Sequence, residues 1–169
     1  MSIYGENNVY QNVRTRVIVT HENRMLLLEP EFPGDGWRVP GGGMEPNESL
    51  AECSVREVME ETGILIQVTN IAFLREFVVP KYCVLPDEDG VTFAMEVYFY
   101  ATPMTDQLEV RRENPQAPMG YWIPFADVPK LPLWPKELKT LVGWLMGICH
   151  RVCLRSYPNW TALMLPRQT

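Results

Sequence analysis

Three consecutive glycines, Gly41 to Gly43, stand shortly before a segment whose two ends are those of a helix. Ser49 and Glu52 have the spacing of a capping box, in which each side chain bonds the other residue's main chain. Gly63 stands where a left-handed glycine ends a helix. The sequence therefore predicts a helix between Ser49 and Gly63. The glycines before it form either a simple tight turn or a loop that a ligand can approach closely.

The predicted helix concentrates negative charge on one side. With about 100° of rotation per residue, Glu57, Glu60 and Glu61 share an arc of roughly 100°. Like charges three and four residues apart repel, and the helix dipole disfavours anions in the last turn. A neighbouring stripe is expected to face the core, apart from the acidic arc, and consists of Ala51, Val55, Val58 and Thr62.

Two interpretations of the acidic arc are open. A solvated face with Glu–Arg pairing would leave the repulsion in place, whereas a bound divalent cation would reverse its sign. Carboxylate oxygens without a nearby His or Cys favour a hard cation. Mg²⁺ is therefore the first choice, and Mn²⁺ can substitute for it.

The spacing of the whole segment is more specific than its separate features. Gly42 is followed after five residues by Glu48, and seven more residues lead to the run Arg56–Ile64, whose sequence is REVMEETGI. This pattern resembles the Nudix box with every defined position filled, and the preceding WRVPG resembles the usual approach to that box. A looser resemblance extends over most of the chain through the early strands and the later YWIPFADVPKL.

The resemblance implies an α/β fold, an α/β/α sandwich around a mixed β-sheet, and the length fits a single domain over residues 1–169. It also implies a Mg²⁺-dependent pyrophosphohydrolase in which water attacks phosphorus. The expected substrate has a diphosphate linkage in a nucleoside diphosphate joined to another group, of the ADP-ribose, ADP-sugar or dinucleoside polyphosphate type, or is an NTP. The alternative is a non-catalytic module of the same fold that binds such a ligand for regulation.

Site residues follow from the resemblance position by position. Glu57, Glu60 and Glu61 would hold the metal directly or through water, and the carbonyl of Gly41 would be a main-chain ligand. Arg56 would pair with box carboxylates and fix their rotamers. The other implied members are Glu48 as a partner of Arg56, and Gly42 and Gly43 beside the substrate.

The general base stays open among several carboxylates. Glu57 is the candidate within the box. Glu96 lies beside Tyr98 on the polar face of a predicted strand, which makes both residues candidates for the site. Glu109 and Glu113 lie in a polar segment, and each of the residues outside the box is otherwise an exposed carboxylate.

The substrate is less well defined by the sequence. Arg14 and Arg16 share one face of a predicted strand and either contact phosphates or face solvent. The aromatic candidates for stacking on a base, or for simple packing, are Phe32, Trp37, Tyr98 and Tyr100. Within the family, Pro80 is a cue for ADP-ribose pyrophosphatases and Tyr82 for diadenosine polyphosphate hydrolases, so the two cues conflict.

The remaining pattern predicts a mostly strand-paired sheet with one helix early and one late, typical of an α+β or α/β sandwich. The expected strands are Arg14–Thr20 paired as a hairpin with Arg24–Glu29, one or two strands in Ile64–Val79, Val91–Ala101 and Tyr121–Pro124, and the late helix runs from Pro135 to about Cys153. Alternation in Val91–Ala101 predicts an apolar face containing Met95, Val97 and Phe99 and a more polar face containing Glu96 and Tyr98.

The distribution of charge and the cysteine content indicate which partners and which compartment to expect. Of the net charge of −6, the segment from Gly41 to Ile64 contributes −5, so the acidic excess is local. It argues against non-specific binding to nucleic acid or to an anionic membrane, and with Mg²⁺ bound the patch should attract a small nucleotide diphosphate substrate. The four cysteines lack CxxC spacing, and the polar N-terminus lacks a signal-peptide core, which favours reduced thiols in the cytoplasm. The apolar tail near Trp160 and Leu163 packs on the domain or supports a homodimer.

Overall fold

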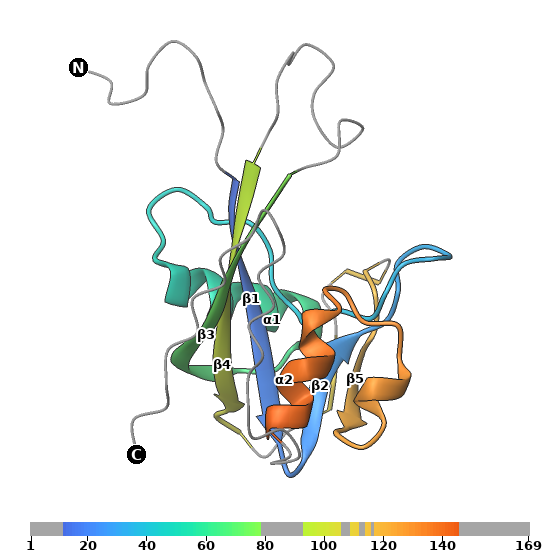
Figure 1. The fold of residues 1–169 in the computed structure, drawn as a ribbon. Helices are drawn as coiled ribbons and strands as arrows, with labels where there is room; N and C mark the ends of the chain where they lie inside the picture. The colour runs from blue at the N-terminus through green and yellow to red at the C-terminus, as the bar shows by residue number, and fades with distance from the viewer. Residues whose placement is uncertain (1–11, 79–92, 106–108, 112–113, 116, 146–169) are drawn as a thin grey trace, which may run out of the picture.

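The computed structural model describes residues 12–78, 93–105, 109–111, 114–115 and 117–145. Five strands form one sheet in the order β3-β4-β1-β2-β5 (Figure 1). They are β1 (Asn12–His21), β2 (Arg24–Leu28), β3 (Ile66–Val78), β4 (Phe93–Pro103) and β5 (Gly120–Pro124). β1 pairs with β4 in parallel, and the other neighbouring strands are antiparallel. The sheet is therefore mixed, which confirms the expected architecture.

The predicted hairpin places β1 in the middle of the sheet. β1 is rich in Val, Ile and Thr, whose branched side chains favour extended backbone. The turn residues Glu22 and Asn23 have positive φ of 44° and 61°, the conformation of tight hairpin turns. Thr20 then pairs with Met25, and His21 with Arg24. β1 consequently has β2 on one side and β4 on the other.

Helix α1 (Leu50–Thr62) begins and ends as predicted. The Glu52 N–H donates to Ser49 Oγ over 3.2 Å, and the Ser49 N–H donates to Glu52 Oε2 over 2.7 Å, which completes the capping box. Gly63 ends the helix with φ of 68°, and its N–H donates to the Met59 carbonyl. These two ends place Glu60 and Glu61 in the last turn, where the helix dipole disfavours them.

The helices α1 and α2 (Glu137–Leu145) cover opposite faces of the sheet (Figure 1). Ile18 of β1 packs with Leu138 of α2 in one buried cluster, whereas its neighbour Val17 packs with Val58 of α1 in the other. This alternation is what a strand covered on both faces requires. A short 3-10 helix, η2 (Val128–Lys130), completes the α2 side with the buried Val128.

The buried stripe of α1 differs from the prediction. Its buried residues are Cys53, Ser54, Val58 and Thr62. Ala51 is exposed, so the predicted core-facing stripe was wrong at this position, whereas the half-buried Val55 packs against the core as predicted. Beside Val58, the helix also packs through small side chains, with Cys53 Sγ 3.3 Å from Thr15 Oγ1 of β1. Its buried side is therefore turned toward the acidic arc instead of lying apart from it.

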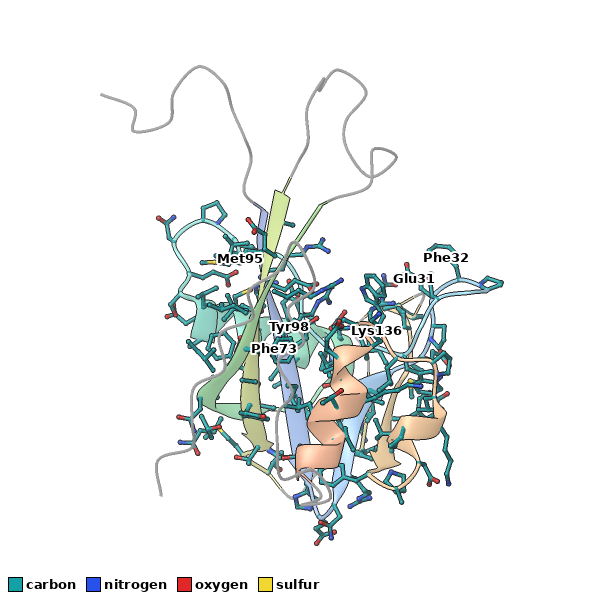
Figure 2. All side chains as sticks on the ribbon, viewed as in Figure 1. Glu31, Phe32, Phe73, Met95, Tyr98 and Lys136 are labelled. Carbon is teal, nitrogen blue, oxygen red and sulfur yellow. The ribbon has the colours of Figure 1, made fainter. Side chains whose placement is uncertain are left out.

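The apolar face predicted for β4 is buried at Val97 and Phe99 but not at Met95, which is 37% exposed. The more polar face is buried too, with Glu96 and Tyr98 only 2% and 1% exposed. The Tyr98 ring stacks on Phe73 of β3 with centroids 4.0 Å apart (Figure 2). On the more polar face, Tyr98 belongs to the same buried cluster as Leu138 of α2, and Glu96 pairs with Arg16 and Arg75.

The late helix starts two residues after the predicted Pro135, and the part predicted beyond Leu145 lies outside the described residues. None of the helices in the described part of the chain is long and apolar enough to cross a membrane.

The backbone at Gly41 gives a stability prediction. Gly41 has φ of 135°, and a Cβ there would lie 2.2 Å from the Thr15 carbonyl oxygen, which the central strand holds in place. Gly34 also has positive φ, 98°, but a Cβ there would meet nothing within 4 Å. Gly34→Ala should therefore cost only the backbone strain, about 1–3 kcal/mol, and Gly41→Ala clearly more. Urea unfolding of both variants measures the difference, and equal losses would contradict the close packing at Gly41.

Candidate functional site

The loop after Pro40 is hydrogen-bonded along the central strand. The Val17 N–H donates to the Pro40 carbonyl over 2.8 Å, and the Thr15 N–H donates to the Gly42 carbonyl over 2.9 Å. The Gly41 carbonyl between them accepts from Arg16 Nη1. The absence of a side chain at Gly41 allows this approach, so the glycine run is a close backbone contact and not a simple turn.

Two carboxylates of α1 lie against this loop. Glu61 Oε2 accepts from the Gly41 N–H over 2.7 Å. The Glu57 carboxyl group lies so close to Gly42 that a Cβ at Gly42 would be 2.4 Å from Glu57 Oε1. The loop and the acidic arc, which the sequence placed on separate elements, therefore form one site.

Arg56 connects most of the other predicted residues. Its Nε and Nη2 donate to the two oxygens of Glu48 over 3.0 and 2.8 Å. Nη2 also donates to the Gly43 carbonyl over 3.0 Å, while Nη1 donates to Glu57 over 3.0 Å and to Glu60 over 3.3 Å. The guanidinium group thus screens the mutual repulsion of the carboxylates. Its hydrogen bonds lower the pKa of Glu48 to about 2.

Glu61 lacks comparable compensation. Burial raises the pKa of its carboxyl group to about 7, although the Gly41 N–H and the charge of Arg16 act in the opposite direction. A carboxylate in this position is short of positive charge. The Gly41 carbonyl and the three carboxylates supply only oxygen donors, a set that suits a hard divalent cation such as Mg²⁺.

The carboxylates do not stand in a ready-made cage. No group of three acidic, His or Cys side chains within the described ranges is placed to hold a metal ion. Glu57 and Glu60 are instead paired with Arg56. The residues present fit an oxygen-ligated cation in their chemistry, and binding one would require Arg56 to give up part of these contacts.

The far side of the loop meets β1 and β4. Arg16 Nε donates to Glu96 Oε1 over 3.0 Å, and Tyr98 Oη donates to Glu96 Oε2 over 2.9 Å. Burial raises the pKa of Glu96, but Arg16 and Tyr98 outweigh burial and hold it below its usual value. The backbones of Arg14 and Gly43 form an isolated antiparallel β-bridge. The Nε of Arg14 is buried and has no hydrogen-bond partner in the described part of the chain.

Two residues of this region were missed from the sequence. Arg75 of β3 donates from Nη1 to Glu96 Oε2 over 3.1 Å, and its guanidinium group lies 4.7 Å from the centre of the Trp134 ring. Trp134 is 54% exposed, so an aromatic surface lies beside the charged cluster. The β3–β4 register pairs Arg75 with Glu96. Arg75 could have been identified from the sequence only by predicting this strand register.

The other predicted site residues either have partners away from the glycine loop or lie outside the described residues. Glu109 is exposed and pairs with Arg111. Trp37 packs edge-on against Tyr121 with ring centroids 5.7 Å apart, and Phe32 is 64% exposed. Glu113, Pro80 and Tyr82 lie outside the described residues, as do Cys83, Cys149, Cys153 and the tail with Trp160 and Leu163.

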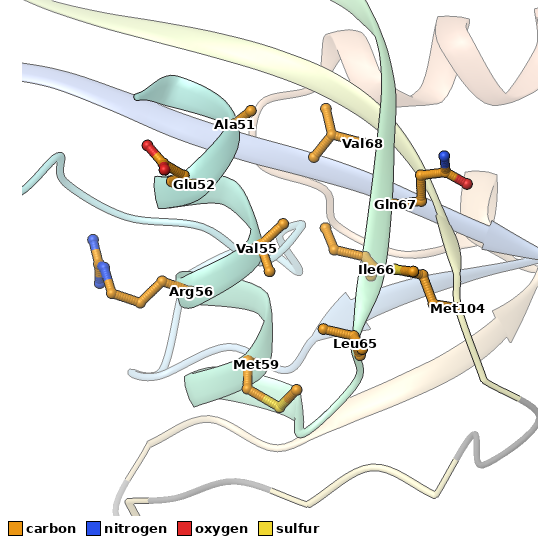
Figure 3. Close-up of a pocket in the computed structure, with 10 residues that line it drawn as sticks. All are labelled: Ala51, Glu52, Val55, Arg56, Met59, Leu65, Ile66, Gln67, Val68 and Met104. Carbon is orange, nitrogen blue, oxygen red and sulfur yellow. The ribbon is translucent and has the colours of Figure 1, made fainter. Parts of the chain in front are cut away.

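A groove of about 610 Å³ lies between α1 and β3 (Figure 3). Aliphatic and Met side chains, among them Val55, Leu65 and Met104, point into it. The three carboxylates of the acidic arc do not line it. The groove therefore borders the charged site only through Arg56, which lines it as well.

Comparison with known proteins agrees with this architecture. A family model described as the NUDIX domain matches residues 11–145. The RNA pyrophosphohydrolase of Ruthia magnifica is 24% identical over 151 residues, which cover 80% of this chain and 84% of that protein. The diphosphoinositol polyphosphate phosphohydrolase 3-beta of Bos taurus is 49% identical over 43 residues, only 25% of this chain and 26% of that protein. The crystal structure of a MutT protein from Bacillus halodurans superposes with a TM-score of 0.55 at 30% identity, covering 78% of this chain and 79% of that one.

The raised pKa of Glu61 predicts a pH effect on stability in the absence of divalent ions. The unfolded chain releases this proton near pH 4.5, whereas the folded protein retains it to about pH 7. The unfolded state therefore binds fewer protons in this window, and stability falls as the pH rises through it. We expect the urea midpoint of the wild type, relative to Glu61→Gln, to decrease between about pH 5 and about pH 8 in EDTA.

Glu48 provides the matched control for this measurement. Its lowered pKa stabilises the folded state above pH 4.5 and loses that effect only as the pH falls toward 2. Glu48→Gln should therefore run parallel to the wild type between about pH 5 and about pH 8. If Glu61→Gln also runs parallel, Glu61 is ionised in the folded protein throughout the range.

Proposed function

Because this chain belongs to the NUDIX domain family, we propose that it is a Mg²⁺-dependent pyrophosphohydrolase that cleaves a diphosphate linkage by attack of water on phosphorus. Hydrolases of this family generally use a divalent metal. The expected substrate is a nucleoside diphosphate joined to another group, or an NTP, and Mn²⁺ is expected to replace Mg²⁺.

The contact between the Gly41 loop and α1 carries this proposal. The Gly41 main chain lies between Glu61, which accepts its N–H, and Arg16, which donates to its carbonyl. Glu57 lies against Gly42 on the same side. These contacts make the glycine loop and two carboxylates of α1 neighbours, which supports a cation site between the two elements. A cation there withdraws charge from the phosphoryl group and lowers the pKa of a bound water.

The remaining residues have distinct proposed roles. Glu57, Glu60 and Glu61 hold the cation, with the Gly41 carbonyl as a main-chain ligand. Arg56 keeps these carboxylates aligned through its bidentate pair with Glu48. Glu57 is the proposed general base, since it borders the loop and is 15% exposed, whereas Glu96 is 2% exposed.

Substrate binding is proposed on the arginine side of the loop. Arg14 lies beside Gly43 and has a buried Nε without a partner among the described residues, so a phosphate oxygen would satisfy it. Gly43 and Gly42 border the same space, and Trp134 offers an exposed ring for an aromatic base. Tyr98 is buried and bonded to Glu96, which favours a supporting role over direct contact.

A non-catalytic role as a ligand-binding regulatory module is the second candidate. The observation that favours it is the pairing of Glu57 and Glu60 with Arg56, which leaves the carboxylates without a ready-made metal cage. The hydrolase is preferred because the half-buried Glu61 is short of positive charge and bonds the N–H of Gly41, the residue whose carbonyl is the proposed main-chain ligand.

Turnover on a substrate panel tests the proposal. The purified protein is incubated with Mg²⁺ and ADP-ribose, sugar nucleotides, dinucleoside polyphosphates and NTPs, and the products are identified by mass. We expect Glu61→Gln to lose about 100-fold in kcat while remaining folded, because it removes one ligand from the cation. Glu52→Gln removes the same charge from the same helix, retains the capping box and should change kcat by less than about twofold.

Two outcomes would count against the hydrolase. If Glu61→Gln kept full activity, the acidic arc would not have the proposed role in the reaction. Tight binding of a panel member without any turnover would support the regulatory module instead.

A further inference from the structure

Glu96 is surrounded by hydrogen-bond donors of the protein. Its Oε1 accepts from Arg16 Nε over 3.0 Å, and its Oε2 accepts from both Arg75 Nη1 and Tyr98 Oη, over 3.1 and 2.9 Å. The side chain is 2% exposed. A general base must present a lone pair to the attacking water. The lone pairs of Glu96 are instead directed at two arginines and a phenol.

One of these arginines, Arg16, reaches the Gly41 loop. Arg16 uses Nε for Glu96 and Nη1 for the Gly41 carbonyl, so one planar group joins β4 to the loop. Because the guanidinium group is rigid, holding its Nε in place also fixes the direction of Nη1. The Gly41 N–H then bonds Glu61. A continuous path of short contacts leads from Glu96 through Arg16 and Gly41 to a carboxylate of α1.

The other arginine extends away from the loop. Arg75 pairs with Glu96 and lies over the Trp134 ring at 4.7 Å. The Trp134 N–H donates to the Trp37 carbonyl over 2.8 Å, which ties this aromatic to the segment just before the loop. Glu96 therefore balances two arginines that serve different parts of the site.

We propose that Glu96 is a positioning residue: it orients Arg16 so that its guanidinium group fixes the carbonyl of Gly41, the residue whose N–H bonds Glu61. This inference rests on the proposed function. Under this proposal Glu96 is not the general base. It affects turnover through Arg16, which joins it to the Gly41 carbonyl. Replacing Glu96 should make the Gly41 carbonyl less fixed and so weaken both turnover and metal binding. The general base should remain in place.

The test compares Glu96→Gln, Arg16→Gln and the double variant with the wild type. We expect each single variant to lose about 10–100-fold in kcat and a similar factor in Mn²⁺ affinity measured by electron paramagnetic resonance. The acidic limb of the kcat–pH profile should keep its wild-type position, because no base is lost. The double variant should lose no more than either single variant, since both break the same connection.

Arg75→Gln is the matched control for the metal measurement. It removes the other arginine from Glu96 but leaves the Arg16–Gly41 contact in place, so Mn²⁺ affinity should stay within about threefold of the wild type. If Glu96→Gln does not fold, Arg16→Gln still decides the question, because Glu96 then retains Arg75 and Tyr98.

Three results would overturn the proposal. If Glu96→Gln lost the acidic limb of the kcat–pH profile, Glu96 would be the general base. Wild-type kcat and Mn²⁺ affinity in folded Glu96→Gln or Arg16→Gln would show that the connection has no effect. A loss in Glu96→Gln that Arg16→Gln does not share would place the role of Glu96 elsewhere. If the wild type hydrolyses no substrate, the proposed function fails, and the Mn²⁺ affinities alone still test the positioning role.

Discussion

The site depends on one close approach, that of the Gly41 backbone to the central strand. The loop can be bonded by Thr15 and Val17 only because Gly41 has no side chain to meet the Thr15 carbonyl. That approach brings the Gly41 amide within reach of Glu61 and its carbonyl within reach of Arg16. Packing of a backbone thus determines where the charged groups meet, and the electrostatics follow from it.

The charges on α1 are tolerated because arginines are placed on both sides of the loop. Arg56 compensates Glu48, Glu57 and Glu60 from within the helix. Among the described residues, Glu61 is bonded by a neutral N–H and is reached by the more distant charges of Arg16 and Arg38, which explains why burial dominates its pKa. The least compensated carboxylate of the acidic arc is therefore the one that bonds the Gly41 main chain. This asymmetry is what a cation would correct.

Local signals in the sequence predicted local structure well. The capping box and Gly63 gave the ends of α1, and the β-branched run gave the hairpin, because neighbours in the chain decide both. Periodicity failed where distant elements decide burial. Cys53 and Ser54 pack inward because the loop brings β1 close, and Glu96 is buried because Arg16 and Arg75 arrive from other strands. The site outside the box could not be predicted for the same reason.

The parallel pairing of β1 with β4 has a consequence for the order in which the molecule can form. The hairpin, the loop and α1 are close in sequence, whereas Arg16 and Glu96 are separated by 80 positions. Loop-closure entropy makes such a distant contact favourable only after nearer ones have formed. A growing chain therefore completes the acidic helix long before the strand that secures the loop is available. Whatever chemistry the helix supports, the protein gains the full geometry only when its later half has folded onto the first.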